Sequence, residues 1–343
     1  MQPPMICGEA ELDELLSRPT PKVVEALSSI DGDVVVLGAA GKMGPTLARM
    51  TQRAFAAAGS RRAVIAVARF SNAAVRARFD GIGIRTIACD LLSREAVARL
   101  PDAAAVIFMV GAKFGTTGGE ARTWATNCYA AALAAERYTG TPAVVFSTGN
   151  VYPLVAVDGG GADEATAPAP VGEYAQSALA RERIFEFFSR EHGTPAVIYR
   201  LNYAVELRYG VLLDVAQRVF AGEPVDLGMG YLNCIWQGDA NAAALRCVSL
   251  VRSPPLILNV TGAETVSVRW LAGRFAERLG REPVYCGDPR PTALLSNSAL
   301  ARELLGAPAV DLETAIAWVA HWVKIGGPTL AKPTHFETRD GRF

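Results

Sequence analysis

Short hydrophobic runs alternate with longer amphipathic segments between residues 33 and 200. The apolar runs lie at residues 33–38, 63–68, 85–89, 104–110, 143–147 and 196–200, and segments with helical spacing lie at residues 42–58, 94–100, 120–138 and 173–191. The short runs are hydrophobic at consecutive positions, which is typical of strands that are buried on both faces of a sheet. Strands that alternate with helices in this way predict a parallel sheet with right-handed crossovers, a doubly wound α/β domain.

The segments on either side of this domain have different patterns. Two short helical patterns come first, and Pro19 and Pro21 separate them because proline breaks a helix. After residue 200 the pattern is mixed and rich in proline, with a last helix expected at residues 312–323. The predicted parts are an N-terminal helical extension packed on the main domain (1–31), the α/β domain (32–200), a smaller and interleaved lobe (201–330) and a C-terminal tail (331–343).

Composition and charge exclude several classes of protein. Half of the 343 residues are hydrophobic and 20% are charged, which is a globular composition rather than a disordered one. The 34 basic residues balance the 34 acidic ones, which argues against nucleic acid or an anionic membrane surface as a partner. The longest apolar stretch, residues 103–112, is half of what a membrane span needs, and the N-terminus shows no signal-peptide pattern. We therefore expect a cytoplasmic protein.

Cysteine and histidine do not occur in patterns that hold metals. The six cysteines are scattered with no CxxC pair and mostly have apolar neighbours, which is typical of free thiols in a reducing compartment. His192, His321 and His335 lack the spacing of a zinc ligand set, and no GxSxG motif supports a hydrolase triad. We expect no metal site, and we expect the histidines to be ordinary surface or core residues.

The sharpest chemical signal is the segment Gly38-Ala-Ala-Gly41-Lys-Met-Gly44, which directly follows the first apolar run and precedes the first long helix. Gly38 permits a tight turn, Gly41 lets a pyrophosphate approach the backbone, and Gly44 allows the helix to pack closely on the strand. The helix N-terminus then faces the anion. This strand–turn–helix context predicts a dinucleotide site, because a plain turn rarely needs three glycines at this spacing.

The end of the second strand bears on the choice of cofactor. An acidic residue there would bind the adenosine ribose and repel a 2′-phosphate, but Ala68 occupies that place and Arg69 and Ser71 follow. Because arginine binds phosphate well, this favours NADP, with NAD as the alternative and a solvated charge as the plain interpretation of Arg69. Asp90, after the third strand, is placed to bind the adenine amino group or, equally, to act as an acid at a helix N-terminus.

With these features in place, the sequence resembles the extended short-chain dehydrogenases/reductases, the NAD(P)-dependent epimerase/dehydratase family. The resemblance runs from about residue 33 to the C-terminal helix and rests on the segments GAAGKMG, IACDLL, VIFMVGAKFG, ATNCYAAAL, VVFSTGNVYP and EYAQSALARERIFE. Later landmarks are NCIWQGDANAAAL, NVTGAETVSV and ALARELLGAP. The resemblance implies a doubly wound parallel Rossmann sheet with a smaller interleaved C-terminal substrate lobe, and hydride transfer between a hydroxyl carbon and nicotinamide.

The resemblance also implies roles for individual residues. Thr148 would hold the substrate oxygen and Tyr174 would be the general acid/base. In the family, a lysine four residues after the tyrosine holds the nicotinamide ribose and lowers the pKa of the tyrosine. Ala178 stands at that position here, and a tyrosine of ordinary pKa, about 10, is a poor base at neutral pH. Further cofactor contacts would come from Lys42, Met43, Leu91, Gly111 and Asn127.

Three interpretations of the missing lysine stay open. Lys113 is the best candidate for a replacement cation, because GAK resembles the Gly-x-Lys with which UDP-galactose 4-epimerases reach the cofactor. Alternatively, the reaction starts from an acidified C–H or a ketone and needs a weaker base. In the third interpretation the site is redox-silent and the chain is an NADP(H)-binding regulatory protein. The retained Thr148, Tyr174 and Asn127 favour a compensated or altered enzyme.

The C-terminal lobe bears on the substrate. Nucleotide-sugar enzymes of the family usually have an arginine that binds the pyrophosphate, and Leu232 stands at that place here. We therefore expect an oxidoreductase or epimerase that acts on a small polyhydroxylated substrate, a sugar or sugar acid, with a nucleotide-sugar epimerase or dehydratase as the alternative. Candidate substrate contacts are Asn150, Asn202, Tyr203, Arg208, Asn233 and Trp236, although a tryptophan in such a place is more often core.

Two helical segments bear on the oligomeric state. Residues 120–138 and 173–189 each carry apolar residues on more than one face, which is consistent either with burial inside one chain or with a contact between chains. The family resemblance favours the second interpretation, a homodimer through a four-helix interface.

Overall fold

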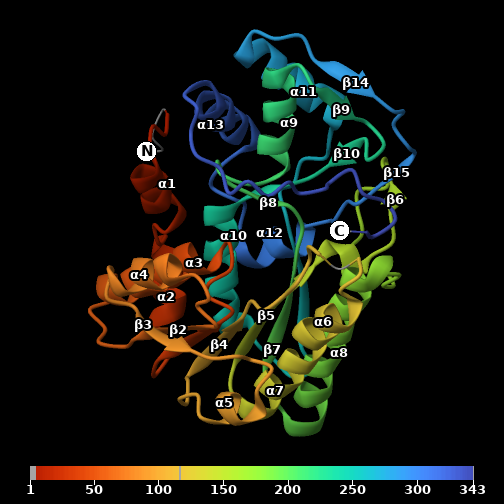
Figure 1. Ribbon diagram of the computed structural model, residues 1–343. Helices are drawn as coiled ribbons and strands as arrows, with labels where there is room; N and C mark the ends of the chain where they lie inside the picture. The colour runs from red at the N-terminus through yellow and green to blue at the C-terminus, as the bar shows by residue number, and fades with distance from the viewer. Residues whose placement is uncertain (1–4, 116, 343) are drawn as a thin grey trace.

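The chain folds around one parallel sheet. The computed structural model describes residues 5–115 and 117–342. Its central sheet has seven strands in the order β12-β7-β5-β4-β1-β2-β3, with every neighbouring pair parallel (Figure 1). The strands are β1 (Val34–Leu37), β2 (Val64–Ala68), β3 (Arg85–Ala88), β4 (Ala105–Phe108), β5 (Ala143–Thr148), β7 (Ala196–Leu201) and β12 (Leu256–Val260). The chain order reverses between β1 and β4, so the predicted doubly wound α/β fold is confirmed.

Six of these strands coincide with the six apolar runs of the sequence. The seventh, β12, comes from the segment expected to form the smaller lobe, and it pairs with β7 at the edge of the sheet. The chain therefore leaves the sheet after β7, builds part of the lobe, and returns to the sheet before it completes the lobe.

Helices cover both faces of the sheet (Figure 1). One face carries α2 (Pro21–Ser28), α3 (Gly44–Ala57) and α10 (Gln237–Arg246), and the other carries α5 (Arg94–Ala98), α7 (Ala130–Arg137) and α8 (Gly172–His192). Alternate residues of β1 enter the two cores: Val36 packs in the first, whereas Val35 and Leu37 pack in the second. Among the described residues, no helix is both long and apolar enough to cross a membrane.

The smaller lobe lies beyond the carboxyl ends of the strands and has a hydrophobic core of its own (Figure 1). Its main elements are α9 (Val211–Ala221), α11 (Val268–Leu279), α13 (Leu312–Lys324) and the strand pairs β9 (Pro224–Asp226) with β14 (Val284–Cys286) and β10 (Tyr231–Leu232) with β13 (Val266–Ser267). Helix α1 (Glu9–Leu16) adds Leu12 and Leu16 to this core. The N-terminal extension is thus divided, because α1 packs on the lobe and α2 on the sheet.

The segment expected as one helix at residues 120–138 contains a wider turn. It consists of α6 (Glu120–Trp124), a π-helical turn (Ala125–Tyr129) and α7. A π-turn accommodates an extra residue and is common at functional sites. The remaining short elements are α4 (Ala73–Asp80), α12 (Ala299–Leu305), β6 (Val155–Ala156), β8 (Ala204–Val205), β11 (Ile235–Trp236), β15 (Thr292–Ala293) and the 3-10 turns at Gly149–Val151 and Cys247–Leu250.

The C-terminal tail runs back from α13 across the lobe to the start of α8. Asp214 of α9 accepts hydrogen bonds from the backbone and the hydroxyl of Thr334. Further along, Arg339 donates to the carbonyl of Thr292. Gly341 then presses on the backbone of Gly172, so closely that neither glycine has room for a side chain. The tail therefore connects the lobe with the end of α8 that carries Tyr174.

Candidate functional site

The glycine segment forms a tight connection between β1 and α3. Gly38 has a φ of +84°, and a side chain there would lie 2.9 Å from the backbone nitrogen of Val110 at the end of β4. A side chain on Gly44 would overlap the carbonyl of Ala39. Gly41 is exposed, and a side chain there would meet the Gly38 carbonyl at 3.3 Å. The loop is therefore narrow where it meets the sheet and open where a ligand would lie.

The N-terminus of α3 fits an anionic cofactor. No side chain caps this helix, and Met43 precedes it in helical conformation. The first backbone amides of a helix lack partners within it and attract anions. The switch point between β1 and β4 places this end at the carboxyl edge of the sheet, where α/β proteins bind nucleotides. The loop and helix end therefore suit the pyrophosphate of a dinucleotide.

The residues expected near the adenosine lie along the same edge. Arg69, directly after β2, is exposed. Asp90 is also exposed, and its Oδ1 accepts a hydrogen bond from the backbone of Leu92, so the carboxylate closes its own turn. Leu91 is buried in the core beneath it.

Asn127 connects the end of β4 with α8. Its side chain is fully buried in the π-turn and pairs with both backbone groups of Ala112, accepting from the nitrogen at 2.8 Å and donating to the oxygen at 3.1 Å. It also donates to the hydroxyl of Ser177 at 2.8 Å. The extra residue of the π-turn lets this side chain reach two elements. Gly111, which precedes Ala112, is exposed.

Thr148 and Tyr174 lie at the end of β5 and in the first turn of α8. The hydroxyl of Thr148 is nearly buried and accepts hydrogen bonds from the backbone and the side-chain nitrogen of Asn150. Tyr174 is half-buried, and Ala178, one turn further on, is completely buried. Ala178 packs in a small apolar cluster with Val151, Tyr152 and Ala162.

A lysine from another element lies beside Tyr174. The ammonium group of Lys113, in the loop after β4, lies 6.0 Å from the centroid of the Tyr174 ring and 5.5 Å from that of Phe114. Burial lowers the pKa of Lys113 to about 8, although Asp214 and Glu337 favour its charged form. The replacement cation suggested by the sequence is therefore close to the tyrosine.

Sequence reasoning missed a second buried cation, Arg181. It follows Tyr174 by seven residues on the same face of α8, and helical side chains lean toward the N-terminus of their helix. One Nη donates to the carbonyl of Val110 at 2.7 Å, beside Gly111. The guanidinium is buried, and its Nε has no partner in the described part of the chain. The seven-residue spacing on one helix face was the available signal.

A buried polar network lies directly behind Thr148. Glu182 accepts two hydrogen bonds from the guanidinium of Arg200, at 2.9 and 2.6 Å, and a third from the hydroxyl of Ser147. Arg200 also donates to the phenol oxygen of Tyr152 at 2.7 Å, and Tyr152 donates to Asn259. The network connects the last residues of β5 with α8, β7 and β12.

Two of the expected substrate residues come together beside the Thr148 segment. Asn202 donates to the side-chain oxygen of Asn233 at 2.9 Å, and Asn233 donates to the carbonyl of Ser296 at 2.7 Å. A side chain on Gly149 would meet the hydroxyl of Ser296 at 2.9 Å. Both asparagines are buried, so they hold the residues around Ser296 against the end of β5.

The structure does not bring Arg208 or Trp236 to this position. The guanidinium of Arg208 pairs with Glu206 and with Glu9 and Asp13 of α1, so three carboxylates already neutralise it. The Trp236 ring packs in the core of the lobe against Trp318, with the ring centroids 5.2 Å apart. Tyr203 has a φ of +42°, and its hydroxyl lies 3.5 Å from the carbonyl of Phe336 in the tail.

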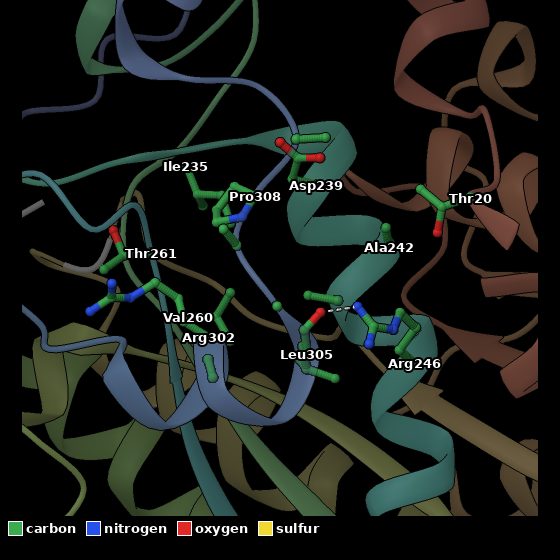
Figure 2. Close-up of a pocket in the computed structure, with 15 residues that line it drawn as sticks. Thr20, Ile235, Asp239, Ala242, Arg246, Val260, Thr261, Arg302, Leu305 and Pro308 are labelled. Atoms are coloured by element: carbon green, nitrogen blue, oxygen red, sulfur yellow. Dashed lines mark hydrogen bonds between the residues drawn. The ribbon is translucent and has the colours of Figure 1, made fainter. Parts of the chain in front are cut away.

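A separate cavity lies between α10 and α12, beside the sheet (Figure 2). It encloses about 90 Å³ between α10, α12, β12 and the loop at residues 306–309. Arg246 donates to the carbonyl of Leu305 across it, and Asp239 accepts from the backbone of Val310. None of the lining residues belongs to the elements that carry Thr148, Tyr174 or Lys113. The cavity therefore adds nothing to the site at the sheet edge.

Comparisons with known proteins agree with this architecture. The UDP-glucose 4-epimerase of Thermotoga maritima, solved with UDP-glucose, superposes with a TM-score of 0.71 at 21% identity, over 85% of this chain and 98% of that one. An epimerase of Methanothermobacter thermautotrophicus superposes with a TM-score of 0.72 at 18% identity, over 90% of this chain and 96% of that one. The UDP-glucuronic acid 4-epimerase of Bacillus cereus, solved with NAD, gives 0.69 at 16% identity, over 85% and 98%. Likeness at these identities shows the fold alone.

The family follows from the sequence itself. None of the curated protein sequences matches the chain. The sequence model described as the NAD dependent epimerase/dehydratase family matches residues 34–205, half of the chain, from the first strand of the sheet to β8. The chain therefore belongs to the NAD-dependent epimerase/dehydratase family.

Proposed function

We propose that the protein is an NAD(P)-dependent oxidoreductase or epimerase. It acts by hydride transfer at a hydroxyl or carbonyl carbon of a small polyhydroxylated substrate, a sugar or sugar acid. The observation that carries this proposal is the ammonium group of Lys113 beside Tyr174, because it supplies positive charge that the family obtains from a lysine at the position of Ala178. The experiment that tests it is the replacement of Tyr174, described in the Discussion.

The chain's own residues then have distinct tasks in oxidation of a carbinol. Thr148 donates a hydrogen bond to the carbinol oxygen, and Tyr174 removes its proton. The Lys113 ammonium stabilises the phenolate form of the tyrosine, with Arg181 as a more distant buried cation. Bound nicotinamide supplies the acceptor for the hydride that leaves the carbon. Reduction reverses both transfers, and an epimerase performs them in succession on the two faces of the carbon.

The cofactor would lie along the carboxyl edge of the sheet. Gly38, Gly41, Gly44 and the backbone of Lys42 and Met43 would hold its pyrophosphate. Leu91 and Gly111 would line the adenine and nicotinamide ends, and Asp90 would bind the adenine amino group. Asn127 would fix the loop after β4 from beneath, as its hydrogen bonds to Ala112 support.

The preference for NADP over NAD is tested by Arg69→Ala. We expect the affinity for NADPH to fall by about tenfold to a hundredfold, the equivalent of one charge-assisted hydrogen bond to the 2′-phosphate, and the affinity for NADH to stay the same. Fluorescence titration with the two nucleotides measures both constants. Arg61→Ala, at the opposite end of the same strand, is the matched control. Tighter binding of NADH than NADPH by the unaltered protein would contradict the preference.

A homodimer is proposed through the helices beside the site. Trp124 on α6, Tyr129 on the π-turn and Phe187 on α8 are large apolar side chains with exposed fractions of 36%, 45% and 55%. We expect light scattering to give the mass of two chains, and Phe187→Asp to give the mass of one. The control is Phe220→Asp, an exposed phenylalanine on α9 of the lobe, which should leave the dimer intact. A monomeric unaltered protein would rule out this interface.

Specific observations bear on the alternatives. Leu232 is completely buried in the core of the lobe, so it cannot replace an arginine for the pyrophosphate of a nucleotide sugar. The alanine at position 178 supports the second alternative, a redox-silent NADP(H)-binding regulatory protein.

The cysteines bear on where the protein works. All six are free, which supports the proposed cytoplasmic location.

A further inference from the structure

Two lysine side chains converge on one aromatic ring between the glycine loop and Tyr174. The ammonium group of Lys42 lies 3.3 Å from the centroid of the Tyr209 ring and 4.6 Å from that of Phe114. The ammonium group of Lys113 lies 5.5 Å from the same Phe114 centroid. Aromatic faces hold cations in place without neutralising them. Two lysine amino groups are thus fixed at the edge of the sheet, next to the proposed general base.

The positive charge at this position exceeds its local compensation. Three lysines, Lys42, Lys113 and Lys332, act on one another here, whereas the carboxylates that favour their charged forms are two, those of Asp214 and Glu337. Burial lowers the pKa of Lys42 to about 7, and the neighbouring charges of Lys113 and Lys332 lower it as well. A buried cation surrounded by other cations is stabilised by any anion that binds between them.

We propose that Lys42 and Lys113 bind an anionic group of the substrate over the Phe114 ring, so that the substrate is a sugar acid or a sugar phosphate rather than a neutral polyol. This inference rests on the proposed function, because it names the substrate class of the same site. A carboxylate or phosphate held there would lie close to Tyr174, as required when the anionic group is a few bonds from the reacting carbon.

The positions of the two side chains separate this anion from the cofactor. The backbone of the glycine loop and the N-terminus of α3 provide a site for the pyrophosphate. The Lys42 side chain instead leaves the loop toward Tyr209, which lies two residues before the start of α9 in the lobe. The C-terminal tail lies against Phe114, because the ring centroid of His335 is 6.2 Å from that of Phe114. The anion site therefore lies between the sheet domain, the lobe and the tail.

The test is calorimetric titration of the full-length protein with defined sugars, in the presence and absence of saturating NADPH or NADH. The anionic ligands are D-glucuronate, D-galacturonate, glucose 1-phosphate and glucose 6-phosphate, and the neutral parents are D-glucose and D-galactose. We expect at least one anionic sugar to bind about tenfold or more tightly than its parent. Lys42→Met should abolish that difference, whereas Lys22→Met, an exposed lysine on α2, should leave it unchanged.

Each outcome has a defined meaning. A stronger response to the uronates or to the sugar phosphates identifies a carboxylate or a phosphate as the anion. Equal binding of anionic and neutral sugars overturns the inference, and so does a Lys42→Met variant that loses nucleotide affinity, because the lysine then serves the cofactor. A protein that binds neither nucleotide contradicts the proposed function, and the sugar titrations without nucleotide still decide the anion site.

Discussion

Replacement of Tyr174 by phenylalanine is expected to lower the rate of hydride transfer by a factor of about 10²–10⁴, the usual contribution of a positioned general acid or base. The variant keeps the aromatic ring beside Lys113 and loses only the oxygen that accepts the proton. Affinity for sugar and nucleotide should change by no more than about fivefold, the value of one neutral hydrogen bond. Single-turnover change in the absorbance of bound nicotinamide, with the sugar that binds most tightly, measures the rate.

The control for this experiment is Tyr285→Phe, which removes a phenol from β14 of the lobe and should leave the rate unchanged. An unchanged rate in the Tyr174 variant would show that this tyrosine takes no part in the chemistry.

A separate variant, Ala178→Lys, tests the regulatory alternative. If the unaltered protein transfers no hydride with any polyol and Ala178→Lys creates turnover, the chain is a redox-silent member of its family. If Ala178→Lys impairs an existing activity, the alanine belongs to an altered mechanism.

The sheet could be predicted because each strand is a local property of the sequence. A run of four to six apolar residues, buried on both sides, leaves a continuous hydrophobic pattern, as β1 and β5 do. Strand β12 carries the same pattern, but its place beside β7 depends on pairing with a distant segment. The π-turn was not predictable for a similar reason. It is fixed by the hydrogen bonds of Asn127 to Ala112 and Ser177, which no periodicity records.

The residues of the candidate site likewise fall into two groups: those that belong to a local motif could be predicted, and those placed by long-range contacts could not. The glycine loop is a local motif, and the family resemblance pointed to Lys113, which the structure places next to Tyr174. Arg181 lies on the same face of α8 two turns beyond Tyr174, but an arginine at that spacing is equally typical of a solvated helix face, so the sequence does not distinguish the two. The positions of Lys42 and His335 around Phe114 depend on how the lobe and the tail close over the sheet. Such long-range contacts leave no pattern along the chain.

The largest effect on stability is expected from the ion pair behind Thr148. The side chains of Arg200 and Glu182 have exposed fractions of 1% and 4%, and two hydrogen bonds join them. Glu182→Gln leaves the guanidinium buried without its countercharge, which typically costs about 3–5 kcal/mol. We expect the free energy of unfolding in urea to fall by that amount. Glu136→Gln is the control, because its exposed pair with Arg94 should contribute less than about 1 kcal/mol.

A double variant separates the buried charge from the loss of packing. Glu182→Gln combined with Arg200→Met removes both charges, and we expect it to be more stable than Glu182→Gln alone, since replacing a complete buried pair by apolar groups is often neutral. If Glu182→Gln lowers the free energy of unfolding by no more than Glu136→Gln does, then Tyr152 and water are sufficient partners for the guanidinium of Arg200. Because Ser147 also binds Glu182, the same substitution loosens the strand end that carries Thr148. Loss of hydride transfer with Tyr174 intact would then be traced to the position of the threonine, one residue beyond this network.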